Sequence, residues 1–169
     1  MSRLVRARGF TLIELMIVVA ILSVVAVLAV VSYGKYVRRA ARSEVVAMLG
    51  EIRVKEEAYV TEYGSYYQAT ANESTFDPAA TGFTPKTPNP SATTYWGPLG
   101  VKFPRPQLYC GYNTIAGAAN TAPSGAVGAA MLGTPNTVWF YARAGCDFDN
   151  NGTISYFNIV YNNTIIQGF

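Results

Sequence analysis

An uninterrupted apolar segment, Leu15–Val31, constrains this chain more than any other feature of its sequence. Its seventeen residues include one polar side chain, Ser23. Counted from Phe10, the segment has twenty-two residues and as an α-helix would be roughly 33 Å long. A helix of that length and composition can cross a lipid bilayer. The segment is therefore expected to be buried either in lipid or among other apolar helices.

A single carboxylate, Glu14, lies at the beginning of this apolar helix. An unpaired carboxylate in hydrocarbon costs at least a few kcal/mol, so we expect Glu14 to have a partner such as an amine. A tolerated charge near the membrane surface is the alternative interpretation. A pairing site would set the register between neighbouring copies of the helix.

The string Gly9-Phe10-Thr11-Leu12-Ile13-Glu14, which follows the basic leader Met1–Gly9, resembles the N-terminus of a type IV prepilin. In that family a dedicated peptidase cuts after the glycine and methylates the new N-terminal residue. The resemblance implies cleavage between Gly9 and Phe10 and N-methylation of Phe10. It also implies that Glu14 meets the amino group of Phe10 in a neighbouring subunit. The close match covers about the first 25 residues; the rest matches only in layout.

Composition and charge narrow the function classes. The chain has no histidine, which removes the commonest general base and argues against an enzyme. Of its thirteen basic residues, Arg3, Arg6 and Arg8 lie in the leader, and the remaining ten match ten acidic residues. Binding to DNA is therefore not supported by charge. The leader is too short for an ordinary secretory signal, and its apolar segment follows the proposed cut.

Helical spacing continues beyond the apolar segment, and no proline interrupts Phe10–Tyr63. One long helix is predicted, with residues 10–33 as its transmembrane or filament-core part and residues 34–63 as an amphipathic part. Gly64 is a natural stop for this helix. Because only one face of the second part is apolar, we expect that part to pack on a domain.

The remainder of the chain predicts a β domain. Residues 64–94 are rich in Gly, Ser, Thr, Asn and Pro and are expected to form an irregular loop. Residues 95–169 are expected to form an antiparallel sheet, with Ala116–Asn136 as an exposed excursion. The four predicted strands are Tyr95–Phe103, Leu108–Ile115, Thr137–Ala144 and Thr153–Tyr161. The predicted fold class is α+β, a long N-terminal helix packed on a four-stranded antiparallel sheet.

Cys110 and Cys146 are the two cysteines of the chain. The resemblance places the domain outside the cytoplasm, where an even number of cysteines favours a disulfide. Such a bridge would contribute about 3–4 kcal/mol in the chain-entropy model. Two buried free thiols are the alternative, and two cysteines without a histidine argue against a zinc site.

The segment Cys146–Ser155 contains the pattern Asp-x-Asp-x-Asn-Gly. In a calcium loop the ligands would be Asp147, Asp149, Asn151 and the carbonyl of Thr153, and calcium is the one possible cofactor indicated by the sequence. The closing glutamate of such a loop is absent, since Asn158 stands in its place. The same residues favour an ordinary Asn-Gly hairpin turn, and both interpretations stay open.

The sequence predicts a structural protein. As a precursor the chain would be inserted in the bacterial inner membrane, where the prepilin peptidase and the inner-membrane assembly machinery would act on it. It would then assemble with copies of itself or other pilins into a cell-surface filament. The alternatives are a type II secretion pseudopilin and a membrane-anchored periplasmic binding module. Many family members have a glycine at the position of Ser23 and a proline at that of Val31, and these two residues bracket the segment that loosens in some assembled filaments. This chain has neither of them.

Overall fold

The computed structural model describes residues 10–89 and 94–168. The described residues form two compact units, which meet in the sequence between Ala40 and Ala41. Helix α1 (Leu12–Tyr63) contributes residues to both units. The prediction of one long helix is confirmed, with its first residue two positions later than expected. Gly64 ends the helix with a φ of 73°, and its N–H donates to the Val60 carbonyl at 2.8 Å. Because glycine adopts this left-handed conformation without strain, it is suited to the position after a helix.

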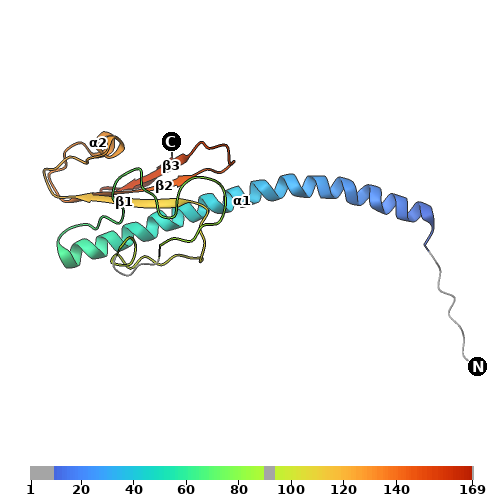
Figure 1. Cartoon of the computed structure of the whole chain (residues 1–169), viewed down its shortest axis with the longest axis horizontal. Helices are drawn as coiled ribbons and strands as arrows, with labels where there is room; N and C mark the ends of the chain where they lie inside the picture. The colour runs from blue at the N-terminus through green and yellow to red at the C-terminus, as the bar shows by residue number, and fades with distance from the viewer. Residues whose placement is uncertain (1–9, 90–93, 169) are drawn as a thin grey trace, which may run out of the picture. The chain divides into compact units, whose positions relative to one another are not determined.

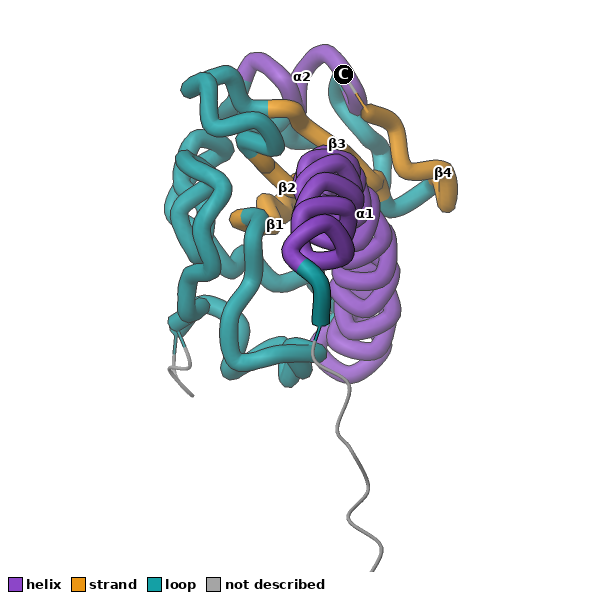
Figure 2. Tube along the Cα trace, turned by 90° about the vertical axis from the view of Figure 1, so that its right-hand side faces the viewer, coloured by secondary structure: helices purple, strands orange, loops and turns teal. Residues whose placement is uncertain are grey.

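The second unit contains an antiparallel sheet whose strands lie in chain order (Figure 1). Its strands are β1 (Gly111–Gly117), β2 (Trp139–Cys146), β3 (Ser155–Val160) and β4 (Asn163–Gly168). The first three correspond to predicted strands, with bounds shifted by up to three residues. The prediction missed β4, which forms a hairpin with β3 and lies at the edge of the sheet (Figure 2).

The prediction of a strand at Tyr95–Phe103 is wrong, because residues 95–100 form consecutive turns and residues 101–103 have no regular structure. Gly97-Pro98 and Gly100 interrupt the aromatic and branched residues that suggested a strand. The Trp96 side chain is nevertheless 2% exposed, and its indole N–H donates to Asp77 at 2.9 Å. The segment therefore contributes apolar side chains to the core without joining the sheet. Three of the four predicted strands are thus present.

Ala116–Asn136 is more ordered than the expected exposed excursion, because it contains the short helix α2 (Ala126–Leu132). Figure 1 shows α2 on the face of the sheet opposite to α1. Gly128 makes close packing possible, because a Cβ there would lie 2.5 Å from the Tyr141 ring. Large apolar residues at helical spacing would have predicted this helix, but the small residues of the segment gave no such signal.

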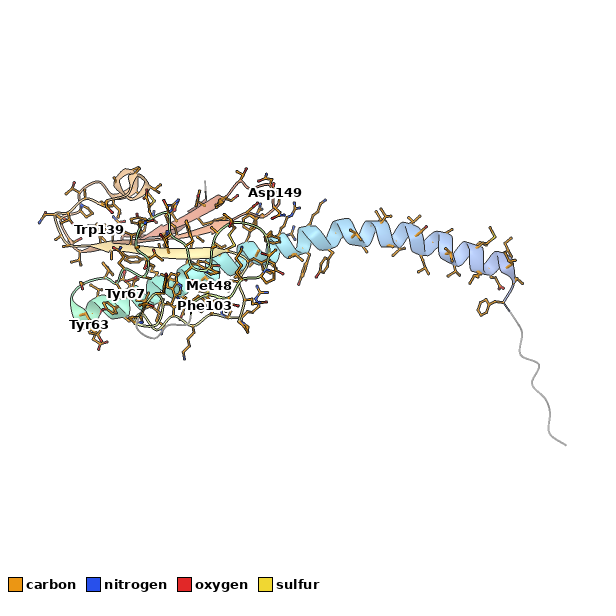
Figure 3. All side chains as sticks on the ribbon, viewed as in Figure 1. Met48, Tyr63, Tyr67, Phe103, Trp139 and Asp149 are labelled. Atoms are coloured by element: carbon orange, nitrogen blue, oxygen red, sulfur yellow. A yellow bond between two sulfur atoms is a disulfide. The ribbon has the colours of Figure 1, made fainter. Side chains whose placement is uncertain are left out.

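The main core lies between the second part of α1 and one face of the sheet, as the α+β prediction requires. Figure 3 shows Met48 and Tyr67 on this side and Trp139 on the other. The α1 residues of the core recur at helical spacing and are at most 1% exposed: Ala41, Val45, Met48, Leu49 and Ile52. Ala142 and Ala144 of β2 belong to the same cluster, and their small side chains give the helix room to pack closely.

A buried carboxylate of α1, Glu44, ties the helix to the segment before β1. Its side chain is 3% exposed and forms a salt bridge with Arg105. It also accepts hydrogen bonds from the Tyr109 backbone N–H at 3.3 Å and from the Tyr112 hydroxyl at 3.5 Å. Burial and the nearby Glu44 carboxylate raise the pKa of Tyr112, so this hydroxyl stays a donor. The pairing crosses long sequence separations, so no local pattern predicted it.

Candidate assembly site on the N-terminal helix

The first unit presents apolar side chains on every side of α1 (Figure 3). Between Leu12 and Val30 the large ones are 48–78% exposed, and Phe10 is 87% exposed. In the part of the chain that the structure describes, α1 is the one helix long and apolar enough to cross a membrane. A helix that is apolar all round requires lipid or other helices around it.

Thr11 and Glu14 form a capping box at the beginning of α1. The Glu14 backbone N–H donates to Thr11 Oγ1 at 3.3 Å, while the Thr11 backbone N–H donates to Glu14 Oε2 at 2.9 Å. The Thr11 hydroxyl also donates to Glu14 Oε2, at 2.7 Å. This arrangement satisfies backbone donors that the first turn of a helix leaves unpaired. The Thr-x-x-Glu spacing is the sequence signal for it, and our sequence reasoning missed it.

The capping box uses one oxygen of the Glu14 carboxylate. All the hydrogen bonds described for this side chain end on Oε2, and Oε1 accepts none from residues 10–89 or 94–168. An ionised carboxylate has about four acceptor positions in total. Glu14 can therefore hold the helix terminus and still accept a hydrogen bond from a second group.

The structure tests two other predicted features of this helix only in part. Gly9 lies outside the described residues, so cleavage at Gly9–Phe10 and methylation of Phe10 stay predictions. Ser23 has its hydroxyl satisfied within the helix, because it donates to the Ala20 carbonyl at 2.8 Å. Helix α1 is continuous through this residue.

The predicted disulfide is confirmed. Cys110 and Cys146 are bonded, with their Cα atoms 4.6 Å apart, and both residues are fully buried. Cys110 immediately precedes β1 and Cys146 ends β2, where Gly111 stands opposite Gly145 in the register. The bridge thus closes the open end of the β1–β2 pair and lies against the α1 core.

The segment between β2 and β3 brings the predicted calcium ligands together at a turn, with Asp149 at its tip (Figure 3). Asp147 is 2% exposed and accepts the backbone N–H groups of Asn151 and Gly152, each at 3.1 Å and each on a different oxygen. Asp149 accepts the Asn151 amide at 2.8 Å. Asn151 in turn accepts the Thr153 backbone N–H at 2.7 Å.

These bonds describe a hairpin turn stabilised by its own side chains. A calcium ion would compete with two backbone amides for Asp147. Within residues 10–89 and 94–168, no three His, Cys, Asp or Glu side chains are grouped so as to hold a metal ion. Calcium binding to Asp147, Asp149, Asn151 and Thr153 stays a prediction.

Comparison with known proteins shows which class of N-terminal segment this chain contains. Residues 4–30 match the family described as the prokaryotic N-terminal methylation motif. This match contains the capping box and most of the exposed apolar surface, so the resemblance stated from the sequence is confirmed.

Two curated relatives from Dichelobacter nodosus, one of them from strain VCS1703A, are named type IV major fimbrial protein FimA. Each is 36% identical to this chain over 100 residues, which cover 48% of this chain and 61% of the relative. The chain is thus similar to these type IV fimbrial proteins but spans less than two thirds of their length. No solved structure matches it significantly.

Proposed function

We propose that this chain is the structural subunit of a type IV pilus-type filament at the cell surface. The observation that carries the proposal is the exposed apolar surface of α1, headed by a carboxylate within the methylation motif. Such a surface is stable in the inner membrane before assembly. Outside the membrane, the helices of other subunits would have to replace lipid, and burial of apolar area would drive assembly. The naming of the two relatives as fimbrial proteins supports the same function.

The proposed maturation begins with a cut by a prepilin peptidase between Gly9 and Phe10, followed by N-methylation of Phe10. The cut creates an amino group one residue before Thr11, the N-cap of α1. In a filament this ammonium group would approach Glu14 of a neighbouring subunit and donate to Oε1, the oxygen that the capping box leaves available. Pairing of the two charges away from water would offset the desolvation of each.

The processing step is tested by mass spectrometry of the N-terminus of the mature protein from cells that make filaments. The expected mass corresponds to a chain that begins with methylated Phe10. In Gly9→Val the leader should remain attached. An intact Met1 in the assembled wild-type subunit, or a cut after the apolar segment, would contradict the proposal.

The pairing step is tested with Glu14→Gln and Thr11→Ala. Glu14→Gln keeps an acceptor for Thr11 but removes the charge, so processed subunits should accumulate in the membrane and filaments should be nearly absent. Thr11→Ala removes the side chain of the cap and leaves the Glu14 charge, so filament number should fall less. Filament counts by electron microscopy, with membrane-fraction immunoblots, measure both; equal filament numbers in Glu14→Gln and wild type would exclude the pairing.

A further inference from the structure

A positively charged side chain is buried on the face of the sheet that carries α2. Arg143 of β2 is 6% exposed. Its Nε donates to Asn158 Oδ1 at 3.1 Å and its Nη1 to the Glu73 backbone carbonyl at 2.9 Å. The guanidinium also lies over the Tyr156 ring, 4.5 Å from its centroid. These contacts hold Arg143 in one orientation.

No carboxylate in the described part of the chain pairs with this charge. Among the described residues, no Asp or Glu oxygen lies within salt-bridge distance of Arg143. The Glu73 carboxylate is engaged elsewhere, because it accepts the Tyr141 hydroxyl at 3.2 Å and the Val127 backbone N–H at 3.2 Å. A buried charge without a counter-charge is destabilising, so its presence needs an explanation other than folding stability.

One buried donor beside this charge has no acceptor, and one nitrogen of the guanidinium itself makes no hydrogen bond among the described residues. Arg143 Nη2 makes none of the hydrogen bonds described for its side chain. Asn158 is 2% exposed, and its Nδ2 is buried without a hydrogen-bond partner. Buried donors are almost always paired in folded proteins, so the unpaired Asn158 amide indicates an acceptor that comes from outside the chain, and Arg143 Nη2 is available to the same acceptor.

Both residues line the same hollow. It has a volume of about 410 Å³ and is bounded by the sheet residues Arg143, Tyr156 and Asn158. Its other wall is apolar and belongs to α2: Ala126, Val127, Ala130 and Met131. This volume lies in the range of small-molecule sites, and the combination of apolar walls with a few convergent donors is typical of them.

We infer that this hollow binds a small carboxylate with an apolar body. The carboxylate would accept hydrogen bonds from Arg143 Nη2 and Asn158 Nδ2, and the planar guanidinium fork suits that geometry. The apolar body would lie between Tyr156 and the Ala130 face of α2. The site is independent of the proposed assembly surface, since every residue of it belongs to the second unit.

The test uses the full chain in non-ionic detergent micelles, with 4-fluorophenylacetate as the probe and ¹⁹F NMR as the measurement. The wild type should shift the probe signal saturably beyond a reference of empty micelles, with a Kd of roughly 1 mM or below. The neutral 4-fluorophenylacetamide should bind at least ~10-fold more weakly, because it lacks the charge that Arg143 recognises. Inorganic phosphate should not displace the probe at equal concentration, because it has no apolar body.

Two variants locate the site. Asn158→Asp gives Arg143 a carboxylate within the chain, so probe binding should weaken at least ~10-fold, as expected for loss of hydrogen bonds to a charged group. Ala130→Phe fills the hollow and leaves both donors in place, so binding should also be lost. Ala129→Phe, on the neighbouring position of α2 and outside the lining of the hollow, is the matched control and should bind as the wild type does.

Circular dichroism melting of the same samples shows whether each variant is folded, and a misfolded Asn158→Asp leaves the Ala130→Phe and Ala129→Phe pair to decide. The inference is overturned if the wild type gives no saturable signal. It is equally overturned if Ala130→Phe binds the probe as tightly as Ala129→Phe does, or if phosphate or the neutral amide binds as well as the probe.

Discussion

The two parts of α1 differ in what covers their apolar side chains. Between Leu12 and Val30 these side chains are 48–78% exposed, whereas the core residues between Ala41 and Ile52 are at most 1% exposed. The second part has charged residues between its apolar ones, so its apolar stripe faces one side and its own chain covers it. The first part is apolar all round, and no single domain surface can cover it. The pattern around the helix therefore distinguishes an intramolecular partner from an intermolecular one.

Two carboxylates that bind backbone amides show the same difference on a smaller scale. Glu14 receives Thr11 on one oxygen and keeps the other available. Asp147 receives a backbone N–H on each oxygen. A carboxylate with an unused oxygen at an exposed helix start is suited to a second molecule. One with both oxygens satisfied and 2% exposure stabilises its own loop.

Removal of the disulfide is expected to have the largest effect on the difference in stability between the two parts. Replacing Cys110 and Cys146 with serine should lower the free energy of unfolding of the second unit by about 4 kcal/mol, as the chain-entropy model gives for a separation of 36 residues. The helix residues before Ala41 lie outside the cross-linked unit. In micelles, circular dichroism should therefore show that strand signal melts earlier while part of the helix signal persists. Simultaneous loss of all helix signal would contradict two independently stabilised parts.

The second prediction compares the effects on stability of replacing two nearby residues in the packed part of α1. Ile52→Ala should destabilise the second unit by roughly 2–5 kcal/mol, because Ile52 is fully buried and its truncation leaves a cavity. Val54→Ala, two residues further on, should change stability by less than about 0.5 kcal/mol since Val54 is 64% exposed. Urea unfolding followed by tryptophan fluorescence measures both. Equal midpoints for the two variants would show that α1 does not pack as described.

The third prediction concerns a carboxyl group that the packed part buries without a cation. Glu56 is fully buried and accepts the Tyr67 backbone N–H at 2.9 Å, while its Oε1 has no partner. Burial raises the pKa of Glu56 from 4.5 to about 8. Between these two values the native state holds a proton that the unfolded state has lost. The contribution of Glu56 to stability is therefore fully present below pH 4.5, is lost as the pH rises through this window, and is constant above pH 8.

Glu56→Gln mimics the protonated form and should remove this dependence. At pH 9 the variant should be clearly more stable than the wild type, because it carries no buried charge, and at pH 4 the two should be nearly equal. Glu62→Gln, an exposed position on the same helix, is the control and should keep the wild-type pH profile. Thermal melts from pH 4 to pH 9 provide the measurement. A Glu56→Gln variant less stable than the wild type at pH 9 would mean that the fold favours the Glu56 carboxylate over a neutral side chain, and it would contradict the raised pKa.

The sequence was sufficient where one local signal dominated. The apolar run and Gly64 predicted α1, and the compartment implied by the leader predicted the Cys110–Cys146 bond. It failed at Tyr95–Phe103, where aromatic residues pack in the core although the segment does not form a strand. It also failed at α2, whose small residues form no apolar stripe at helical spacing. Thr11 carried a readable signal in its spacing to Glu14. Arg143 carried no such signal in the sequence, because only the folded structure shows that no described carboxylate lies within salt-bridge distance of it.

The smallest expected effect concerns the Asp147 turn, where the sequence left a calcium loop and a plain hairpin turn open. Because both Asp147 oxygens already accept backbone N–H groups, we expect millimolar calcium to change the stability of the second unit by less than about 0.4 kcal/mol, the value for an ion near its dissociation constant. Asp147→Ala should destabilise the turn by about 1–3 kcal/mol, since it leaves two backbone donors unpaired. Asp149→Ala removes one exposed side-chain contact and should have little effect. Melting curves of the three proteins with calcium and with a chelator decide the matter. A rise in the wild-type melting temperature with calcium that disappears in both variants would establish the calcium loop. Asp147 would then bind a partner from outside the chain, as we propose for Glu14.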